Sequence, residues 1–247
     1  MPEAVGVVIP AYKEQDNIAA LITRLRATLP DAWIVVVDDS PDLATVEAAE
    51  KAKASLPLGD RISTIHRQGK GGRGSAVLEG MKRLLGAGCE RVVEMDSDFS
   101  HPPEEIPGHL TTAREHKLDL LIASRYLPES KIENWPFKRR VFSRCSNGLA
   151  RFLLGIPISD YTNGFRFYSR RATAEAVNNC GKLGKGFIAL SEILVKLDLA
   201  GFSIGEAPTQ FINRLRGESS VTFEELRWAI TGLFSIMAFQ RSARRGA

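Results

Sequence analysis

The 247-residue sequence contains only three cysteines, which lie far apart. Cys89, Cys145 and Cys180 show no C-x-x-C spacing, which argues against a zinc site and for reduced thiols in the cytosol. No uninterrupted apolar run is long enough to span a bilayer, and the residues after Pro2 and Glu3 do not resemble a signal peptide. We therefore expect a cytoplasmic protein whose chain does not cross a membrane.

Two glycine motifs of nucleotide-binding proteins are also missing. The turn after the first expected strand, 10–14, lacks G-x-G-x-x-G, which argues against a dinucleotide-dependent oxidoreductase. The glycine-rich segment 69–74 lacks the spacing of a P-loop. We interpret this segment as a tight turn, with close approach to a ligand as the alternative.

The composition is that of a soluble globular protein, with 44% hydrophobic and 25% charged residues. The net charge of +4 suits phosphate-bearing ligands or an anionic membrane surface, although solubility alone explains the number equally well. The length fits one α/β domain, with or without a small appendage. We expect no nucleic-acid partner.

Apolar runs alternate with helical patterns along the first half of the chain. This alternation predicts a mostly parallel sheet with helices on both faces. The expected strands are 5–9, 33–37, 62–66, a run ending at 96, and 118–123; the expected helices are 18–29, 43–54, 75–85 and 104–116. Asp16 or Asn17 is available to cap the first helix. The second half is less regular, with helices expected at 139–154 and 189–199, strands at 164–168 and 202–207, and an apolar segment at 223–239.

Carboxylates follow three of the expected strands, the first of which is followed by Glu14. Asp96 and Asp98 end the fourth strand and are separated by one residue, so both can face one cation. A hard divalent ion takes one or two carboxylates and completes its shell with phosphate oxygens. Asp38 and Asp39 end the second strand, where acids accept hydrogen bonds from a base or ribose, or cap a helix. Open α/β sheets place ligands at this edge, so the three acidic ends indicate a nucleotide site.

Several motifs in one order resemble glycosyltransferase family 2, and within it the dolichol-phosphate (polyprenyl-phosphate) mannosyltransferases. The resemblance covers residues 5 to about 221. The motifs are Pro10-Ala11-Tyr12-x-Glu14, Val37-Asp38-Asp39-Ser40, Met95-Asp96-Ser97-Asp98-x-Ser100-His101-Pro102-Pro103, Ser124-Arg125-Tyr126, Asn134-Trp135-Pro136 and Asp160-x-x-Asn163-Gly164-Phe165-Arg166. The resemblance implies a GT-A fold, which we assign to residues 1–221. We expect residues 222–247 to form an amphipathic helix that binds a membrane or a partner.

The resemblance also implies roles for individual residues. The guanosine would lie among Pro10, Tyr12, Glu14, Asp39 and, in support, Asp38. The metal and the diphosphate would be held by Asp96, Ser97, Asp98 and Ser100, a position where the family often has Gln. The acceptor phosphate would be gripped by Arg125, Arg139 and Ser143. The departing diphosphate would be covered by the segment Phe211-x-x-Arg214-x-x-Gly217-x-Ser219, after which Ser220 stands where the family usually has Lys.

The implied reaction is single displacement with inversion, transferring a hexose, most simply mannose from GDP-mannose, to dolichyl or polyprenyl phosphate with Mg²⁺ or Mn²⁺. Asp98, Arg125 and Arg214 would be catalytic. A phosphate monoester is largely dianionic near neutral pH, so this nucleophile needs no general base. The alternatives are a UDP-glucose or UDP-aminosugar enzyme of the same kind, and a catalytically silent membrane-peripheral subunit.

A polyprenyl acceptor lies in a bilayer, and two segments have the pattern of in-plane membrane helices. Residues 134–154 combine Trp135, Phe137, Phe142 and Phe152 with five basic residues, and 228–239 is apolar with an arginine-rich end. Packing on the core or on a partner subunit is the alternative for both. We expect peripheral binding to the cytoplasmic face of a membrane, directly or through a membrane-anchored subunit.

Overall fold

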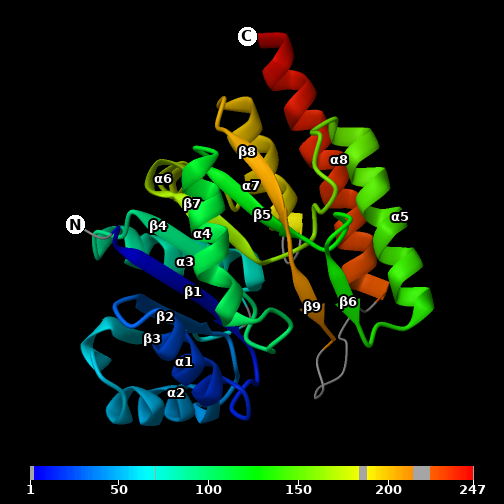
Figure 1. The fold of residues 1–247 in the computed structure, drawn as a ribbon. Coiled ribbons are helices and arrows are strands. Elements are labelled where there is room, and N and C mark those ends of the chain that lie inside the picture. Colours follow the sequence, from blue (N-terminus) through cyan, green and yellow to red (C-terminus); the bar gives the residue numbers. More distant parts are fainter. Residues whose placement is uncertain (1–2, 70, 184–187, 214–222, 247) are drawn as a thin grey trace.

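The computed structural model describes residues 3–69, 71–183, 188–213 and 223–246, with the side chains of the last helix from 231 to 245. A seven-stranded sheet runs through the molecule in the order β3-β2-β1-β4-β7-β5-β8 (Figure 1). Its strands are β1 (Val5–Ala11), β2 (Trp33–Asp38), β3 (Ile62–His66), β4 (Arg91–Glu94), β5 (Leu120–Ser124), β7 (Arg166–Ser169) and β8 (Ile204–Pro208). Only β7 runs antiparallel to its neighbours among these strands. The expected mostly parallel sheet is confirmed.

Eight α-helices and a second, two-stranded sheet complete the described part of the chain. The helices are α1 (Ile18–Thr28), α2 (Ala44–Ser55), α3 (Arg73–Gly86), α4 (Ile106–Glu115), α5 (Phe137–Leu154), α6 (Arg170–Asn179), α7 (Ile188–Leu199) and α8 (Phe223–Gly246). Two short 3-10 helices precede β3 and α4, η1 (Gly59–Arg61) and η2 (Pro103–Glu105). The small sheet pairs β6 (Lys131–Glu133) with β9 (Gln210–Ile212) in parallel.

Sequence patterns predicted most of these elements but missed three of them. Helix α6 and strands β6 and β9 were not expected, because the two strands have three residues each and α6 carries few apolar side chains. Helix α3 begins two residues before the expected start, and α8 runs beyond the expected 239. Asn17 does stand at the cap position of α1, but its side chain makes no capping bond. It donates instead to Glu14 Oε2 at 2.7 Å.

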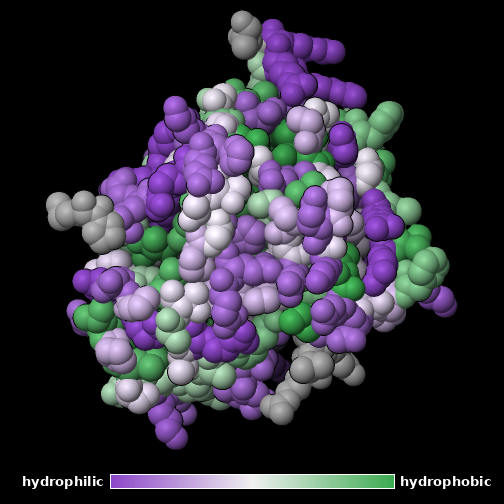
Figure 2. All heavy atoms as spheres, in the orientation of Figure 1, coloured by the Kyte–Doolittle hydropathy of each residue, from purple (hydrophilic) through white to green (hydrophobic). Residues whose placement is uncertain are grey.

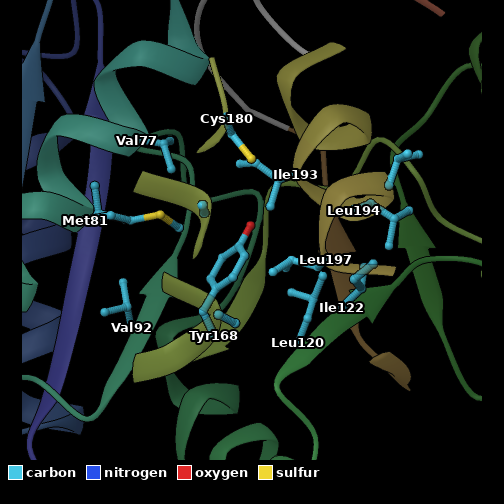
Figure 3. Close-up of a cluster of buried hydrophobic side chains, with 14 of the residues drawn as sticks. Val77, Met81, Val92, Leu120, Ile122, Tyr168, Cys180, Ile193, Leu194 and Leu197 are labelled. Carbon is cyan, nitrogen blue, oxygen red and sulfur yellow. The ribbon is translucent and has the colours of Figure 1, made fainter. Parts of the chain in front are cut away.

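The hydrophobic core forms two layers, one on each face of the main sheet. Successive residues of a strand point to opposite faces, so Val8 and Val92 join one layer while Val7 and Val93 join the other. Helices α3, α6 and α7 cover the first layer, shown in Figure 3 around Tyr168. Helices α1, α2 and α4 cover the second. Fully burying one such aliphatic side chain contributes about 1.5–3 kcal/mol, so the apolar strands fix both the sheet and its register.

The described part of α8 packs against α7 and α5, as Figure 1 shows. Ile236 is fully buried, and Gln240 donates to the carbonyl of Leu154 at 2.8 Å. Gly232 lies so close to α7 that a Cβ there would be 2.6 Å from Ile188. Core packing therefore accounts for one face of this helix. Contact with a membrane or a partner stays a prediction for the other face, as does a domain boundary at 221.

Candidate active site

The three acidic strand ends lie at one edge of the sheet. Ala11 at the end of β1 pairs with Asp38 at the end of β2, and the amide of Met95 bonds the carbonyl of Val8 in β1. Because β1, β2 and β4 are parallel neighbours, the residues that follow them emerge on the same side. The turn after β1, the Asp38-Asp39 pair and the Asp96–Asp98 segment are thus brought together as predicted.

Asp38 is fully buried and bonded within the protein. Its Oδ1 accepts from the hydroxyl of Ser40 at 2.6 Å, and its Oδ2 lies 3.2 Å from Nδ1 of His66. The hydroxyl of Ser40 in turn accepts from the amide of Lys13 at 2.7 Å. Asp38 therefore braces the turn after β1, which is consistent with the supporting role expected for it.

Asp39 is held by an arginine that sequence reasoning missed. Arg67 follows β3 and donates from Nε and Nη2 to the two carboxylate oxygens of Asp39, each at 2.6 Å. The amide of Gly72 donates to the same carboxylate at 3.0 Å. Bidentate arginine–carboxylate pairs of this kind fix the orientation of both groups. The position of Arg67 directly after a strand was the available signal.

The turn after β1 presents Tyr12 and Glu14. Lys13 has φ of 58°, a left-handed conformation that few residues with a side chain adopt. Tyr12 is 42% exposed, and the amide of Glu14 donates to the hydroxyl of Thr45 at 3.1 Å. Pro10 stands at the end of β1, opposite Val37 of β2. The turn offers an aromatic ring and an acid at the sheet edge, as a nucleoside site requires.

Arg73 is a second cation that sequence reasoning missed. It begins α3, within the glycine-rich segment, and donates from Nε at 3.0 Å and from Nη2 at 2.8 Å to Oδ1 of Asp96. It also donates to Oε1 of Glu94, which is fully buried. Burial by itself would lower the pKa of Arg73, but the carboxylates of Asp96 and Glu94 outweigh burial and raise it. The glycine-rich segment is thus more than a turn, since it delivers a permanent positive charge to Asp96.

Gly164 is explained by the same contact. A Cβ at this position would lie 2.0 Å from Nη2 of Arg73 and 3.3 Å from Oδ1 of Asp96. Any side chain there would displace the Arg73–Asp96 pair. The glycine of the Asn163-Gly164-Phe165 motif therefore makes room for a salt bridge at the edge of the sheet.

Residues 97–100 form a turn that is tied to β9. Ser97 and Ser100 are buried, and Oδ1 of Asp98 accepts from the amide of Ser100 at 3.1 Å. Phe99 has φ of 59°, so the turn is tight. The carbonyl of Ser100 accepts from the amide of Ile212 at 3.0 Å. This bond joins the acidic turn to the strand that directly precedes segment 214–222.

Arg214, expected to stabilise the departing diphosphate, lies outside the described residues. The same holds for Gly217, Ser219 and Ser220 of that segment. Their roles stay predictions.

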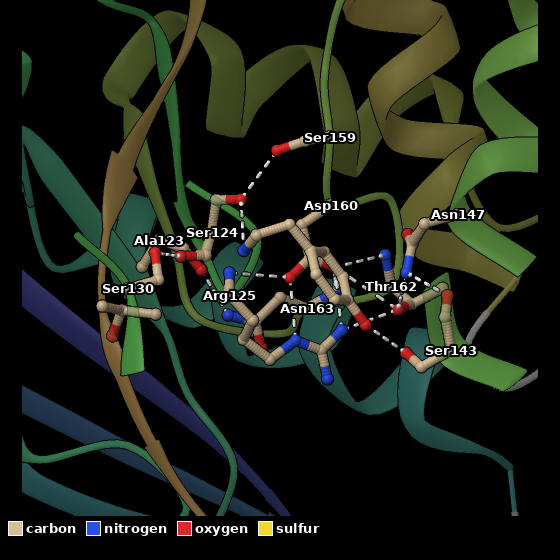
Figure 4. Close-up of polar contacts among 12 residues, drawn as sticks. Ala123, Ser124, Arg125, Ser130, Ser143, Asn147, Ser159, Asp160, Thr162 and Asn163 are labelled. Atoms are coloured by element: carbon tan, nitrogen blue, oxygen red, sulfur yellow. Dashed lines mark hydrogen bonds and ion pairs between the residues drawn. The ribbon is translucent and has the colours of Figure 1, made fainter. Parts of the chain in front are cut away.

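Arg125 is buried in an ion pair with Asp160 (Figure 4). Its Nε and Nη2 donate to the two carboxylate oxygens, each at 2.8 Å, and Nη2 also donates to the hydroxyl of Thr162 at 2.7 Å. Burial alone would raise the pKa of Asp160, but Arg125 and the hydrogen bonds outweigh burial and lower it. Asp160 belongs to the predicted Asp160–Arg166 motif, so that motif holds Arg125 in place.

The other expected acceptor residues lie beside Arg125. The guanidinium of Arg139 lies 4.8 Å from the ring centre of Trp135, and that of Arg125 lies 5.3 Å from it. Nη1 of Arg139 also donates to Oδ1 of Asn213 at 2.9 Å. Ser143 accepts from the hydroxyl of Tyr126 at 2.6 Å, and Tyr126 in turn lies beneath Arg125. Arg125, Arg139 and Ser143 thus form one cluster, with its arginines ordered by Trp135.

This packing decides between two alternatives for Trp135. The segment 134–154 was expected either on a membrane-facing surface or packed on protein, and Trp135 is 8% exposed and packs edge-on against Phe211 at 5.1 Å. An aromatic ring stabilises a cluster of arginines, because its faces attract guanidinium groups. Trp135 therefore belongs to the site interior, while Asn134 and Pro136 on either side of it are exposed.

His101 of the acidic motif is fully buried and has a packing role. Its ring stacks on Phe165 at 4.8 Å and meets Phe211 edge-on at 5.1 Å. Neither ring nitrogen has a hydrogen-bond partner within the described part of the chain. Burial, followed by the charge of Arg125, lowers the pKa of His101 to about 4 despite nearby acids. His101 is therefore neutral at neutral pH and fills the space behind the acidic turn.

Helix α5 shows an exposed apolar stripe next to this cluster. Phe137, Val141, Cys145, Leu149 and Phe152 lie on its outward face, with Phe137 79% and Phe152 83% exposed. Figure 2 shows apolar side chains along the margin where α5 lies in Figure 1. The predicted amphipathic helix is confirmed, and its apolar side faces away from the rest of the described structure. No helix in the described ranges combines the length and apolarity needed to cross a bilayer.

Taken together, the sheet order, the antiparallel β7 and the acidic edge define a GT-A type domain, the fold of nucleotide-sugar transferases. The Glycosyl transferase family 2 model matches residues 6–176, and the chain belongs to this family of glycosyltransferases. The resemblance stated from the sequence is confirmed at this level.

Curated relatives cover nearly the whole chain. The chain is 38% identical over 225 residues to polyprenol monophosphomannose synthase of Mycolicibacterium smegmatis, and the match covers 91% of this chain and 83% of that protein. The chain is also 33% identical over 215 residues to undecaprenyl-phosphate mannosyltransferase of Micrococcus luteus, and this match covers 87% of this chain and 86% of that protein.

Solved structures show the same fold. Glucosyl-3-phosphoglycerate synthase of Mycobacterium tuberculosis superposes with a TM-score of 0.66 at 18% identity, covering 96% of this chain and 81% of that one. A complex of that enzyme with Mn²⁺, uridine diphosphate and glucosyl-3-phosphoglycerate superposes with a TM-score of 0.65 at 19% identity, covering 96% and 81%.

Proposed function

We propose that this protein transfers mannose, with inversion, from GDP-mannose to a polyprenyl phosphate, using Mg²⁺ or Mn²⁺. The observation that carries the proposal is the pairing of two clusters of opposite charge at one edge of the sheet. The acids at 96 and 98 suit a metal-bound sugar nucleotide, and Arg125 with Arg139 suits an anionic acceptor. The two curated mannosyltransferases, similar over most of their length, support the choice of sugar and lipid.

The acidic turn fits a hard divalent cation. Asp96 and Asp98 are separated by one residue, and Asp96 is partly exposed with a side-chain exposure of 27%. No group of three or more His, Cys, Asp or Glu side chains suited to a metal occurs within the described ranges. Two carboxylates are enough for Mg²⁺, which takes its remaining ligands from water and phosphate oxygens. A bound cation would draw charge toward the departing diphosphate.

The residues of the donor side would bind and orient the nucleotide. Tyr12 offers an exposed ring for the base, and Glu14 and Asp39 offer carboxylate acceptors for base or ribose. Asp39 is already oriented by Arg67, so little ordering is needed on binding. Arg214 would donate hydrogen bonds to the diphosphate where negative charge builds in the transition state.

The residues of the acceptor side would hold the lipid phosphate. That phosphate is itself an anionic nucleophile, so the site must overcome repulsion between two anions and does not need a base. Arg139 and Ser143 would bind the phosphate, and Arg125, fixed by Asp160, would add its charge nearby. Arginine is suited to this work because its planar fork matches phosphate oxygens.

The exposed stripe on α5 would bring the cluster to the bilayer that holds the acceptor. Apolar faces bordered by Lys and Arg suit helices that lie in a membrane interface. In this arrangement the protein binds the cytoplasmic face of a membrane peripherally, directly or through a membrane-anchored subunit.

The test is transfer of labelled sugar into organic solvent. Purified protein, a short-chain polyprenyl phosphate and Mn²⁺ are incubated with labelled GDP-mannose, and in parallel with labelled UDP-glucose. We expect metal-dependent label in the lipid phase with GDP-mannose alone. Label from UDP-glucose alone would support the UDP-sugar alternative. No label from either donor, with no thermal stabilisation by GDP or UDP, would support a silent subunit.

A further inference from the structure

Two neighbouring cavities are lined by α5 and by residues that follow β5, and neither is lined by the acidic turn. One has a volume of about 280 Å³ and is lined by Tyr126, Arg144, Asn147, Gly148, Arg151 and Ser159. The other, also about 280 Å³, shares Tyr126 and Arg144 and adds Arg140 and Arg125. No carboxylate is among the lining residues that the structure describes. Arg140, Arg144 and Arg151 therefore line this space together with Arg125, whose charge is already paired with Asp160.

The three arginines of α5 in these cavities lie on one side of the helix. Arg140, Arg144 and Arg151 are spaced by four and seven residues, which places them on one helical face. Within the described chain, Arg144 and Arg151 form no ion pair, and Nε of Arg140 is buried without a hydrogen-bond partner. Arg140 makes one bond, from Nη2 to the carbonyl of Ile132 at 3.1 Å. Unpaired guanidinium groups around a cavity suit a phosphate.

This arginine row borders the exposed apolar stripe. Each arginine directly precedes a member of the stripe in sequence: Arg140 precedes Val141, Arg144 precedes Cys145, and Arg151 precedes Phe152. A helix that lays Phe137, Leu149 and Phe152 into a bilayer would hold the row at the depth of the lipid phosphates. A soluble anion would have no need of the apolar stripe beside its site.

We propose that the cavities lined by Arg140, Arg144 and Arg151 bind the phosphate of an anionic membrane phospholipid, at a site that adjoins the acceptor cluster through Arg125 and Tyr126. The lipid headgroup fixes α5 against the bilayer and so sets the height of the acceptor cluster. The inference goes beyond the proposed reaction, and its test contains no donor and no polyprenyl phosphate. Its failure would leave the transferase activity to be judged by the labelled-sugar assay.

The experiment measures binding of the full chain to vesicles at one fixed ionic strength. Vesicles of phosphatidylcholine alone are compared with vesicles that also contain phosphatidylglycerol. A Lys or Arg near an anionic surface contributes about 1 kcal/mol, or about fivefold in affinity. We expect Arg140→Gln/Arg144→Gln/Arg151→Gln to bind the anionic vesicles about a hundredfold more weakly. The matched control Lys51→Gln/Lys82→Gln/Arg83→Gln removes the same charge from exposed positions on α2 and α3 and should change affinity less than about threefold.

A single pair of variants separates a defined site from general attraction. Arg144→Gln should weaken binding to anionic vesicles by about fivefold, whereas Lys138→Gln, exposed on the same helix but outside the cavities, should change it less than about twofold. Both positions are at the surface, so both variants should keep the parent's melting temperature.

Three outcomes would overturn the proposal. Equal losses of affinity for Arg144→Gln and Lys138→Gln would mean that binding depends on overall charge and not on a defined site. Equal binding of the parent to neutral and anionic vesicles would mean that no lipid phosphate is bound specifically. Thermal stabilisation of the parent but not of the triple arginine variant by inorganic phosphate, without vesicles, would assign the cavities to a soluble anion.

Discussion

The two sides of the proposed active site, the donor side around Asp96 and the acceptor side around Arg125, are built in opposite ways. On the donor side, acids follow parallel strands, and arginines from neighbouring loops neutralise them: Arg67 binds Asp39, and Arg73 binds Asp96. On the acceptor side, arginines from one loop and one helix are supported by aromatic rings and a single buried acid, Asp160. The proposed donor side therefore consists of acids supported by arginines, and the proposed acceptor side consists of arginines supported by rings and one acid.

The two sides also differ in how they meet their surroundings. Strands β1, β2 and β4 are buried on both faces, so the donor acids stand on a rigid base. Helix α5 buries only one face and leaves bulky apolar side chains exposed on the other. A rigid base suits a small soluble ligand that must be positioned closely. An exposed apolar face suits a ligand that arrives from a bilayer. The predictions below test this difference.

The largest effect is expected on the donor side. Asp96→Asn/Asp98→Asn should reduce sugar transfer by about a thousandfold or more, because the variant loses the charges that hold the cation, and with it the cation that stabilises the departing diphosphate. The measurement is labelled-lipid formation, with Mn²⁺-dependent thermal stabilisation by GDP as a readout besides activity. If the variant transferred sugar as fast as the parent with Mn²⁺ present, the metal site would be elsewhere.

The next largest effect concerns the support of the acceptor side. Asp160→Asn leaves Arg125 buried without its counter-charge, so the free energy of unfolding should fall by about 3–5 kcal/mol. Glu104→Gln is the matched control, because it breaks an exposed pair with Arg24 and should cost less than about 1 kcal/mol. Urea unfolding measures both. Equal costs would mean that Asp160 does not hold Arg125 in the folded protein.

The same pair makes stability depend on pH. The pKa of Asp160 in the folded protein lies below its ordinary value of 3.8, so folding favours the ionised form. Its contribution is present above about pH 4 and is lost as pH falls through the lower, folded-state pKa. Unfolding measured across the acid range should show the parent losing stability below pH 4 more steeply than Asp160→Asn. Parallel curves would contradict the assignment.

A moderate effect is expected when the acceptor cluster loses one cation. Arg139→Ala should reduce transfer to a short-chain polyprenyl phosphate by about 10- to 100-fold, the loss of one charge-assisted hydrogen bond of about 1.5–3 kcal/mol. Stabilisation by GDP and Mn²⁺ should stay at the parent's level, because Arg139 lies on the acceptor side. Arg83→Ala removes an exposed arginine elsewhere, on α3, and serves as the control. Unchanged transfer by Arg139→Ala would show the acceptor assignment to be wrong.

The smallest effect on stability is expected on the exposed face of α5. Phe152→Ser should change the free energy of unfolding by no more than about 0.5 kcal/mol, because the ring has little packing to lose. Phe167→Ala, in the fully buried core, should cost about 3–5 kcal/mol. Thermal or urea unfolding compares the two. A large cost for Phe152→Ser would mean that this face is packed against protein in solution.

Sequence patterns predicted the donor side better than the acceptor side. The strands ending at Ala11, Asp38 and Glu94 are apolar runs whose carboxyl ends must meet at one edge, so their acids could be grouped without coordinates. Arg67 and Arg73 could not be placed there, because they come from loops whose paths depend on how β3 and α3 pack. The glycine-rich segment was read as a turn for the same reason.

On the acceptor side, the motifs named the residues but did not fix their surroundings. The amphipathic pattern of α5 is plain in the sequence, yet a pattern does not say which face is covered. The pattern left Trp135 open to a membrane-facing or a packed position, and it is buried because Phe211 and two arginines pack around it. Asp160 lies 35 residues from Arg125, and a pair so distant in sequence is decided by the fold.

By itself, the sequence determined which residues form the main sheet, which strands are apolar, and that acids follow three of them, because these depend on short-range periodicity. It also determined the family, through motifs in a fixed order. Only the tertiary structure decided which arginine neutralises which acid, which face of α5 stays exposed, and where cavities lie beneath it. Those features arise from contacts between segments far apart in the chain. The geometry of these contacts is fixed only when helices pack on both faces of the sheet.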